Sequence, residues 1–227
     1  SINLPRIGIK NGIVTNGKAN MDNFFKELEE KLDLVKDQLL ERFEMQCSKK
    51  VYNFPFLLGQ GLWIDSEKLR DTDNLKKVLK HGTMSIGFTG LAECLKALTG
   101  KHHGESEESQ KLGLKIISFM REKCDKYSEK YNLNFSLVAT PSGNLTTELI
   151  KMDQAIYGKI KNITDKEIYT DSFQLPKDYK ISIEKKIKIE APYHKLTNGG
   201  HIIEITLPEN ATEDDFMKVI DLMKNYD

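Results

Sequence analysis

The chain has 227 residues, which is enough for one large domain or two small ones with a sizeable core. Its 39% hydrophobic and 30% charged residues are typical of a globular protein with a well-solvated surface. Lys and Arg (34) balance Asp and Glu (34), and no apolar run approaches the roughly 20 residues of a membrane span, so composition argues against direct nucleic-acid binding and against a membrane protein.

The chain contains three widely separated cysteines, Cys47, Cys94 and Cys124. They lack a CxxC spacing, which excludes a disulfide framework or a Cys-rich zinc site within this sequence. Cys94 and Cys124 fall on apolar stripes of predicted helices and are expected to be buried as small hydrophobic residues. No signal peptide opens the chain, so we expect a cytoplasmic protein.

The first predicted element is a β-strand over residues 1–9, where apolar residues alternate with others. Pro5 cannot donate a ladder hydrogen bond, so this strand is expected at a sheet edge. The chain opens without Met and in the middle of a strand pattern. This opening favours a segment cut from a longer protein.

Residues 22–47 show the clearest helical pattern, with apolar residues at three- and four-residue steps and charged residues opposite. Asn20 or Asp22 can cap its start. Residues 54–63 are apolar but broken by Pro and Gly, so we expect a buried irregular connector with Trp63 in the core. A short helix is predicted within residues 71–80.

The centre of the chain has the pattern of an α/β sheet. A strand and a Gly-containing turn over 81–90 precede an apolar helix over 91–98. A polar loop, 99–106, leads to a second long amphipathic helix over 105–130, and a strand over 133–139 follows. Because ligands of α/β sheets lie at the carboxyl ends of the strands, we expect the functional site there.

The last third of the chain begins with a short helix over 144–158. Alternating isoleucines predict β-structure over 180–190 and again over 201–207. The sequence Asn-Gly-Gly-His at 198–201 is interpreted as a hairpin turn between these two strands. A closing helix is predicted over 213–226. No linker or repeat divides the chain, so residues 1–227 are interpreted as a single α/β domain.

A polar turn follows the strand over 133–139 and precedes a helix. Its hydroxyl groups, small residues and backbone N–H groups suit phosphate oxygens. The alternative is an ordinary turn with Pro and Gly at favoured positions, and composition alone favours that alternative. The candidate substrate-binding residues are Ala139, Thr140, Pro141, Ser142, Gly143 and Asn144.

Three other patterns are candidate chemical sites. His102-His103-x-Glu105 lacks the spacing of a zinc peptidase, and its loop is better interpreted as an anion site before a helix N-terminus. The run from Ser85 to Gly90 lacks the full dinucleotide fingerprint, and its small residues are consistent with close helix packing. No Gly-x-Ser-x-Gly elbow is present. The residues alone therefore indicate an α/β domain with a candidate anion site, no catalytic residue and no metal ligand.

Five runs, taken together and in order, resemble the anaerobic (class III) ribonucleoside-triphosphate reductase family. Each run alone is weakly specific, whereas five in the expected order are specific. They are SINLPRIGI (1–9), PFLLGQGLW (55–63), HGTMSIGFTGLAE (81–93), GKHHGES (100–106) and EAPYHKLTNGGH (190–201).

The resemblance implies a ten-stranded glycyl-radical-type α/β barrel, of which this chain would form the second half, with strands packed against long amphipathic helices. It also implies an ATP-binding oxidoreductase that converts ribonucleoside triphosphates to deoxyribonucleoside triphosphates for DNA replication. The radical cysteine loop is expected upstream of this chain, and the glycyl-radical segment with its zinc site beyond it. The fragment is therefore expected to hold no cofactor and to be inactive alone.

The implied partners are a ribonucleoside triphosphate, an activating protein that uses S-adenosylmethionine and an iron–sulfur cluster, and a second copy in a homodimer. The family has a Thr-Pro-Ala-Glu turn near the substrate phosphates, and Thr140-Pro141 is similar to it. Gly143 stands where the family usually has Glu, which weakens the transfer at that position. The alternatives are a free-standing nucleotide- or phosphate-binding module without catalysis and a pyruvate formate-lyase relative, against which the 81–106 run argues.

Overall fold

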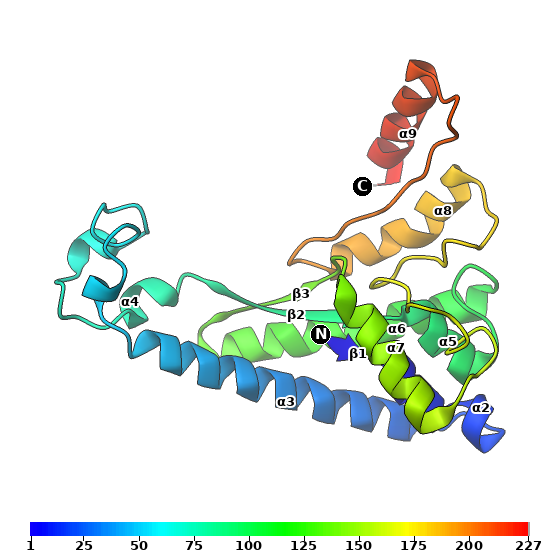
Figure 1. Ribbon diagram of the computed structural model, residues 1–227, viewed down its shortest axis with the longest axis horizontal. Helices are drawn as coiled ribbons and strands as arrows, with labels where there is room; N and C mark the ends of the chain where they lie inside the picture. Colours follow the sequence, from blue (N-terminus) through cyan, green and yellow to red (C-terminus); the bar gives the residue numbers. More distant parts are fainter. Residues whose placement is uncertain (227) are drawn as a thin grey trace.

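A computed structural model describes residues 1–226 and has a small parallel sheet at its centre (Figure 1). The sheet contains β1 (Ile2–Asn3), β2 (Thr83–Thr89) and β3 (Asn134–Val138), in that order. Ile2 pairs with Phe88, and Gly87 pairs with Val138, so the three strands end at one edge. The predicted α/β class is confirmed, and the first strand lies at the sheet edge as expected.

The first strand is much shorter than predicted, because α1 (Leu4–Asn11) begins directly after Asn3. The Asn3 side chain accepts a hydrogen bond from the Arg6 N–H and caps the helix, and Pro5 occupies the first turn, where a missing N–H costs nothing. The alternating apolar residues of 1–9, which predicted a strand, therefore lie mostly in a helix. A short helix, α2 (Ile13–Asn16), follows.

The main core lies between the sheet and the helices α3 (Met21–Cys47), α5 (Leu91–Thr99) and α6 (Glu107–Tyr131). All three helices were predicted. Asn20, one of the two expected residues, caps α3, and Ser106 caps α6. Cys94 and Cys124 are fully buried in this core, as predicted. The largest fully buried apolar side chains include Phe24, Leu28, Leu32, Ile86, Phe88, Leu91 and Leu95.

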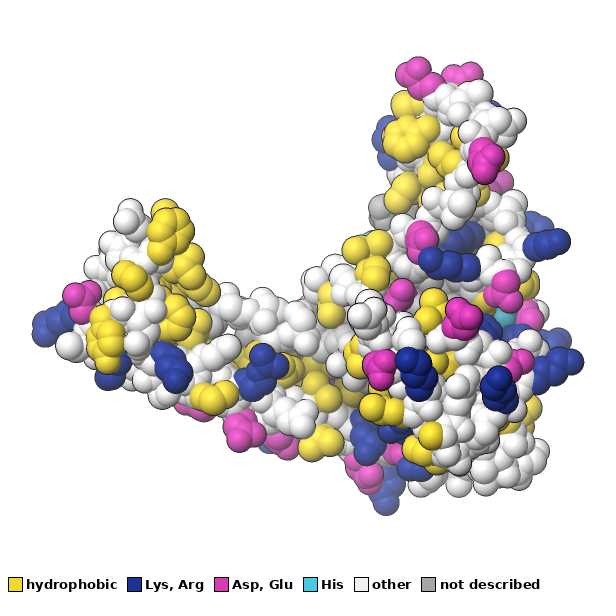
Figure 2. All heavy atoms as spheres, in the orientation of Figure 1, with side chains coloured by type: hydrophobic (Ala, Val, Ile, Leu, Met, Phe, Trp, Pro, Cys, Tyr) yellow, Lys and Arg dark blue, Asp and Glu magenta, His cyan; other side chains and the backbone are white. Residues whose placement is uncertain are grey.

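A projecting arm, residues 48–82, joins the far end of α3 to β2 (Figure 1). It has a small core of its own, formed by Val51, Leu58, Leu75 and Val78, against which Trp63 packs. The expected buried connector is wrong, because Phe56 and Leu62 are 71% and 65% exposed and apolar side chains gather on the arm in Figure 2. Its short helices are η1 (Val51–Asn53), η2 (Ser66–Lys68) and α4 (Lys76–Leu79).

The rest of the chain adds α7 (Asn144–Tyr157), α8 (Ile183–Glu190), the 3-10 helix η3 (Ala191–Leu196) and α9 (Glu213–Tyr226). The predicted β-structure over 180–190 is wrong: Ser182 caps a helix whose Ile183 and Ile187 lie one turn apart. Residues 202–207 belong to no helix or strand, and within residues 1–226 the segment 201–207 forms a single bridge, a parallel one between Ala139 and His201. The predicted hairpin at 198–201 is therefore wrong as well.

Within residues 1–226, none of the helices combines the length and apolarity required to cross a membrane.

Candidate functional site

The carboxyl ends of all three strands meet at one edge of the sheet. Asn3 ends β1 and pairs with Thr89 at the end of β2, and β3 leads directly into Ala139. This is the edge at which α/β sheets bind ligands. The structure therefore places the predicted residues 139–144 at the expected edge, close to two segments that sequence analysis did not connect with them.

The turn at residues 139–144, hereafter the 139–144 turn, joins β3 to α7. Ala139 is buried, whereas Thr140, Pro141, Gly143 and Asn144 are exposed. Gly143 has φ 55° and ψ −132°, a conformation that favours glycine, and a Cβ there would meet open space. Among the described residues, no side chain caps α7 and no acidic residue lies in its first turn. The N–H groups at this helix start can therefore receive an anion.

One short segment, residues 170–172, hereafter the strap, crosses the edge beside this turn. The Gly90 N–H donates to the Thr170 carbonyl at 2.8 Å, and the Leu91 N–H donates to the Ser172 carbonyl at 3.1 Å. Asp171 forms an antiparallel bridge with Thr89. Its Oδ1 also accepts the Ser142 N–H at 2.8 Å. The strap thus ties the end of β2 to the 139–144 turn.

A second segment, residues 198–202, lies along the end of β3 on the other side. The Gly199 N–H donates to the Leu137 carbonyl at 2.8 Å, and the Ala139 N–H donates to the Gly200 carbonyl at 2.9 Å. The Cβ of a larger residue at Gly199 would lie 2.7 Å from the Ser136 hydroxyl, so glycine allows this close approach. The ring of His201 stacks on that of His194 with centroids 3.9 Å apart. This segment sets the position of the chain entering the turn.

A buried carboxylate supports the end of β1. Asp153 of α7 is fully buried and accepts three hydrogen bonds: from Asn3 Nδ2 at 2.9 Å, from Arg6 Nε at 2.6 Å and from the Tyr169 hydroxyl at 2.8 Å. Burial and the neighbouring carboxylate raise the pKa of Tyr169, so its hydroxyl remains a donor at neutral pH. Asp153 therefore fixes α1, α7 and the segment before the strap relative to one another.

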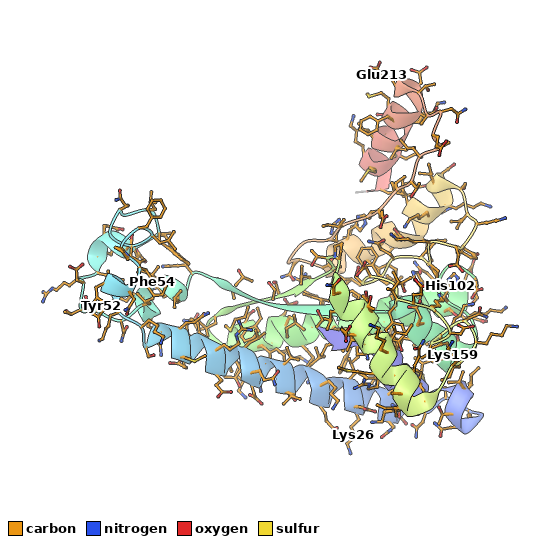
Figure 3. All side chains as sticks on the ribbon, in the orientation of Figure 1. Lys26, Tyr52, Phe54, His102, Lys159 and Glu213 are labelled. Carbon is orange, nitrogen blue, oxygen red and sulfur yellow. The ribbon has the colours of Figure 1, made fainter. Side chains whose placement is uncertain are left out.

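The expected anion site in the loop before α6 is not supported. His102 and His103 are each only 2% exposed, and the region of His102 lies in the body of the protein beside α5 and α6 (Figure 3). The Glu105 carboxylate accepts the His102 N–H at 2.8 Å, and Ser106 caps α6, so groups of the chain itself occupy the helix start. Burial lowers the pKa of His102 to about 4 and that of His103 to about 3, so both rings are neutral at pH 7.

Several other expectations bear on chemistry. Gly90 has φ 74°, and a Cβ there would lie 2.2 Å from Pro5 Cγ, so this glycine permits close packing of α1 rather than forming a dinucleotide site. Within residues 1–226, no group of three or more His, Cys, Asp or Glu side chains is arranged to hold a metal ion. All three cysteines are buried, and burial raises the pKa of Cys124 to about 12. These thiols are unsuited to act as nucleophiles or ligands.

Sequence analysis gave no role to Asp153 or Asp171, and it interpreted residues 198–201 as a hairpin turn rather than as a support of the 139–144 turn. Asp153 falls within a predicted helix, and Asp171 lies in a stretch to which no element was assigned. Neither belongs to a motif with recognisable spacing. Their roles depend on contacts across 147 residues for Arg6 and Asp153 and across 29 residues for Asp171 and Ser142, which no local pattern records.

Comparison with known proteins gives a consistent result. The family model for anaerobic ribonucleoside-triphosphate reductase matches residues 1–227. The anaerobic ribonucleoside-triphosphate reductase of Salmonella typhimurium is 33% identical over 89% of this chain and 28% of its own length. The corresponding protein of Enterobacteria phage T4 is 31% identical over 92% of this chain and 33% of its own length. The chain thus spans about a third of the curated relatives that it matches.

Solved structures show the same fold over nearly the whole chain. An anaerobic ribonucleotide reductase superposes with a TM-score of 0.73 and 21% identity, and the match covers 99% of this chain and 32% of that chain. The anaerobic ribonucleotide reductase from Thermotoga maritima in complex with dATP and CTP gives a TM-score of 0.71 at 20% identity, covering 99% of this chain and 34% of that one. At these identities, the likeness is one of fold.

Proposed function

The chain belongs to the anaerobic ribonucleoside-triphosphate reductase family, and on that premise we propose that it forms part of an oxidoreductase that reduces ribonucleoside triphosphates to deoxyribonucleoside triphosphates by radical chemistry. The observation that carries the proposal is the match of the family model across residues 1–227. In this proposal the chain contributes part of the wall of a ten-stranded barrel, with β1, β2 and β3 as neighbouring parallel strands.

The specific role proposed for this chain is to hold the substrate phosphates at the 139–144 turn. Two features support it: the turn lies at the shared carboxyl ends of the strands, and no described side chain caps α7. The turn itself contains neither Lys nor Arg. Phosphate contacts would therefore come from backbone N–H groups at a helix start, which carry a partial positive charge.

The radical steps are not assigned to residues of this chain. The proposed whole enzyme uses a glycyl radical generated by an activating protein with S-adenosylmethionine and an iron–sulfur cluster. The cysteines present do not fit a radical-carrying thiol or a zinc site, because Cys47, Cys94 and Cys124 are all buried in helix packing. We therefore propose a binding and supporting role for this chain. By its resemblance to the family, we also propose that it pairs with a second copy in a homodimer.

The phosphate site can be tested by removing one backbone donor. Asn144 is the first residue of α7, a position at which proline is tolerated because its N–H has no partner within the helix. Asn144→Pro should weaken CTP binding at least fivefold without lowering the melting temperature by more than a few degrees. Glu107→Pro, the matched change at the first position of α6, should leave CTP binding unchanged.

Binding is best measured by isothermal titration of the 227-residue chain with CTP, CMP and cytidine. The proposal predicts that affinity falls as phosphates are removed. Equal affinity for CTP and cytidine, or a full-strength CTP response in Asn144→Pro, would contradict a phosphate site at this turn.

A further inference from the structure

The strap presents an unusual combination of rigid backbone anchoring and a side chain directed at the neighbouring turn. Its carbonyl groups at Thr170 and Ser172 accept the N–H groups of Gly90 and Leu91, so its path follows the end of β2 and the start of α5. The Thr89 hydroxyl also donates to the Thr170 carbonyl at 2.9 Å. The backbone of the strap therefore cannot shift without disturbing the strand end.

The buried carboxylate of Glu93 also anchors the strap. Glu93 of α5 is fully buried and accepts hydrogen bonds from the Thr170 hydroxyl and, at 3.3 Å, from the Thr170 N–H. Lys166 Nζ lies 3.1 Å from the same carboxylate, and this ion pair balances its charge. Glu93 therefore holds Thr170, the residue directly before Asp171.

The strap is also held in an unfavourable conformation. Ser172 has φ 45°, in the left-handed region that non-glycine residues rarely adopt, and its side chain is fully buried. Among the described residues, its hydroxyl has no hydrogen-bond partner. Both features cost stability, and such strain is concentrated where proteins fix the geometry of a functional site. Here it lies next to Asp171.

We propose that Asp171 is a positioning residue for phosphate binding, an inference that rests on the function proposed for the 139–144 turn. Its Oδ1 accepts the Ser142 N–H at 2.8 Å and so fixes the turn immediately before Gly143. That bond occupies one donor of the turn and holds the residue directly before Gly143 and Asn144, whose N–H groups are the ones proposed to bind phosphate. The role requires the acceptor oxygen and not the negative charge, because a carboxylate repels the phosphates beside it.

This inference makes opposite predictions for two substitutions. Asp171→Asn retains an acceptor oxygen for Ser142 and removes the charge, so CTP should bind with the wild-type affinity or more tightly. Asp171→Ala removes the acceptor and frees the turn, so CTP affinity should fall at least fivefold. Asp178→Ala, an exposed carboxylate seven residues further along, should behave as wild type.

A second measurement reports directly on the turn. In amide hydrogen exchange followed by NMR, the Ser142 N–H should exchange at least tenfold faster in Asp171→Ala than in wild type, and should remain protected in Asp171→Asn. Melting temperatures of both variants would show that the fold is retained. A purely structural role would lower the melting temperature without separating the two variants in CTP affinity.

The outcomes separate this inference from the function on which it rests. If Asn144→Pro loses CTP affinity and Asp171→Ala does not, the phosphate site stands and the role of Asp171 is refuted. If Asp171→Asn loses as much affinity as Asp171→Ala, the charge rather than the acceptor matters, and the inference is again refuted. If wild type itself does not distinguish CTP from cytidine, the proposed function fails first.

Discussion

The buried carboxylate of Asp153 is expected to be among the most destabilising side chains to remove. It is fully buried and accepts hydrogen bonds from Asn3, Arg6 and Tyr169. Removing one partner of a buried ion pair costs about 3–5 kcal/mol. The Arg6 side chain remains one-third exposed and regains water, so the lower end, about 3 kcal/mol, is expected for Asp153→Ala.

A double-mutant cycle isolates the bond between Asp153 and Tyr169. Tyr169→Phe alone should cost about 1.5–3 kcal/mol, the usual contribution of a hydrogen bond to a charged group. In the Asp153→Ala background, the hydroxyl has lost its acceptor, so the same change should cost almost nothing. Urea unfolding followed by far-ultraviolet circular dichroism measures all four free energies.

Glu148→Ala, on the exposed face of the same helix, serves as the control and should stay within about 0.5 kcal/mol of wild type. If the Asp153 and Tyr169 effects add within about 0.5 kcal/mol, the two side chains are energetically independent, and the network described here does not hold.

Two further predictions concern close packing and pH. A Cβ at Gly12 would lie 2.1 Å from the Ala97 carbonyl oxygen, so Gly12→Ala should lower the free energy of unfolding by about 3 kcal/mol. Gly17 has φ 68° but open space around it, so Gly17→Ala should lower it by only about 1 kcal/mol in the same urea titration. Equal losses in the two variants would refute the packing argument. Burial lowers the pKa of His103 from 6.5 to about 3, so between these pH values the ring is protonated in the unfolded chain and neutral in the folded one. The free energy of unfolding should therefore fall as the pH drops below about 6.5, by about 1.4 kcal/mol per pH unit. The dependence of unfolding free energy on pH should be weaker in His103→Gln. An unchanged dependence would show that other groups cause it.

Periodicity predicted the long helices because their apolar stripes are long enough to be unambiguous. Residues 22–47 and 105–130 each include more than six turns, and the observed helices Met21–Cys47 and Glu107–Tyr131 agree closely with them. The strand over 133–139 was also correct, since Leu133, Phe135 and Leu137 alternate with polar residues between an Asn in the left-handed region and a polar turn. In these elements, local pattern and tertiary burial agree.

The isoleucine-rich segments failed because an alternating pattern over a few residues also fits a helix. Ile183 and Ile187 are one helical turn apart, and the Ser182 cap decides in favour of α8. Residues 201–207 do alternate, but β3 offers only one backbone bridge, at His201, and the chain then leaves the sheet. Such outcomes depend on which partner is available, and a single sequence does not contain that information.

The position of the 139–144 turn at the carboxyl ends of the strands was predicted, whereas the segments that hold the turn were not. The end of a strand, followed by a polar turn and a helix, is a local signal, and it led to residues 139–144. The strap that holds the turn has no such signal, since Asp171 resembles any other surface Asp in sequence. Its significance comes from its bridge to Thr89 and its hydrogen bond to Ser142.

The length of α3 would turn a small tilt of its N-terminal half into a larger displacement of the arm at its other end. Its 27 residues extend for roughly 40 Å at 1.5 Å per residue. Phe24, Leu28 and Leu32, its fully buried apolar contacts, all lie in the half nearer its start. A tilt of about 5° about Leu28 would move Cys47, roughly 28 Å further along the helix, by roughly 2–3 Å. Because α3 leads directly into the arm, the packing of α3 against the core sets where the arm lies.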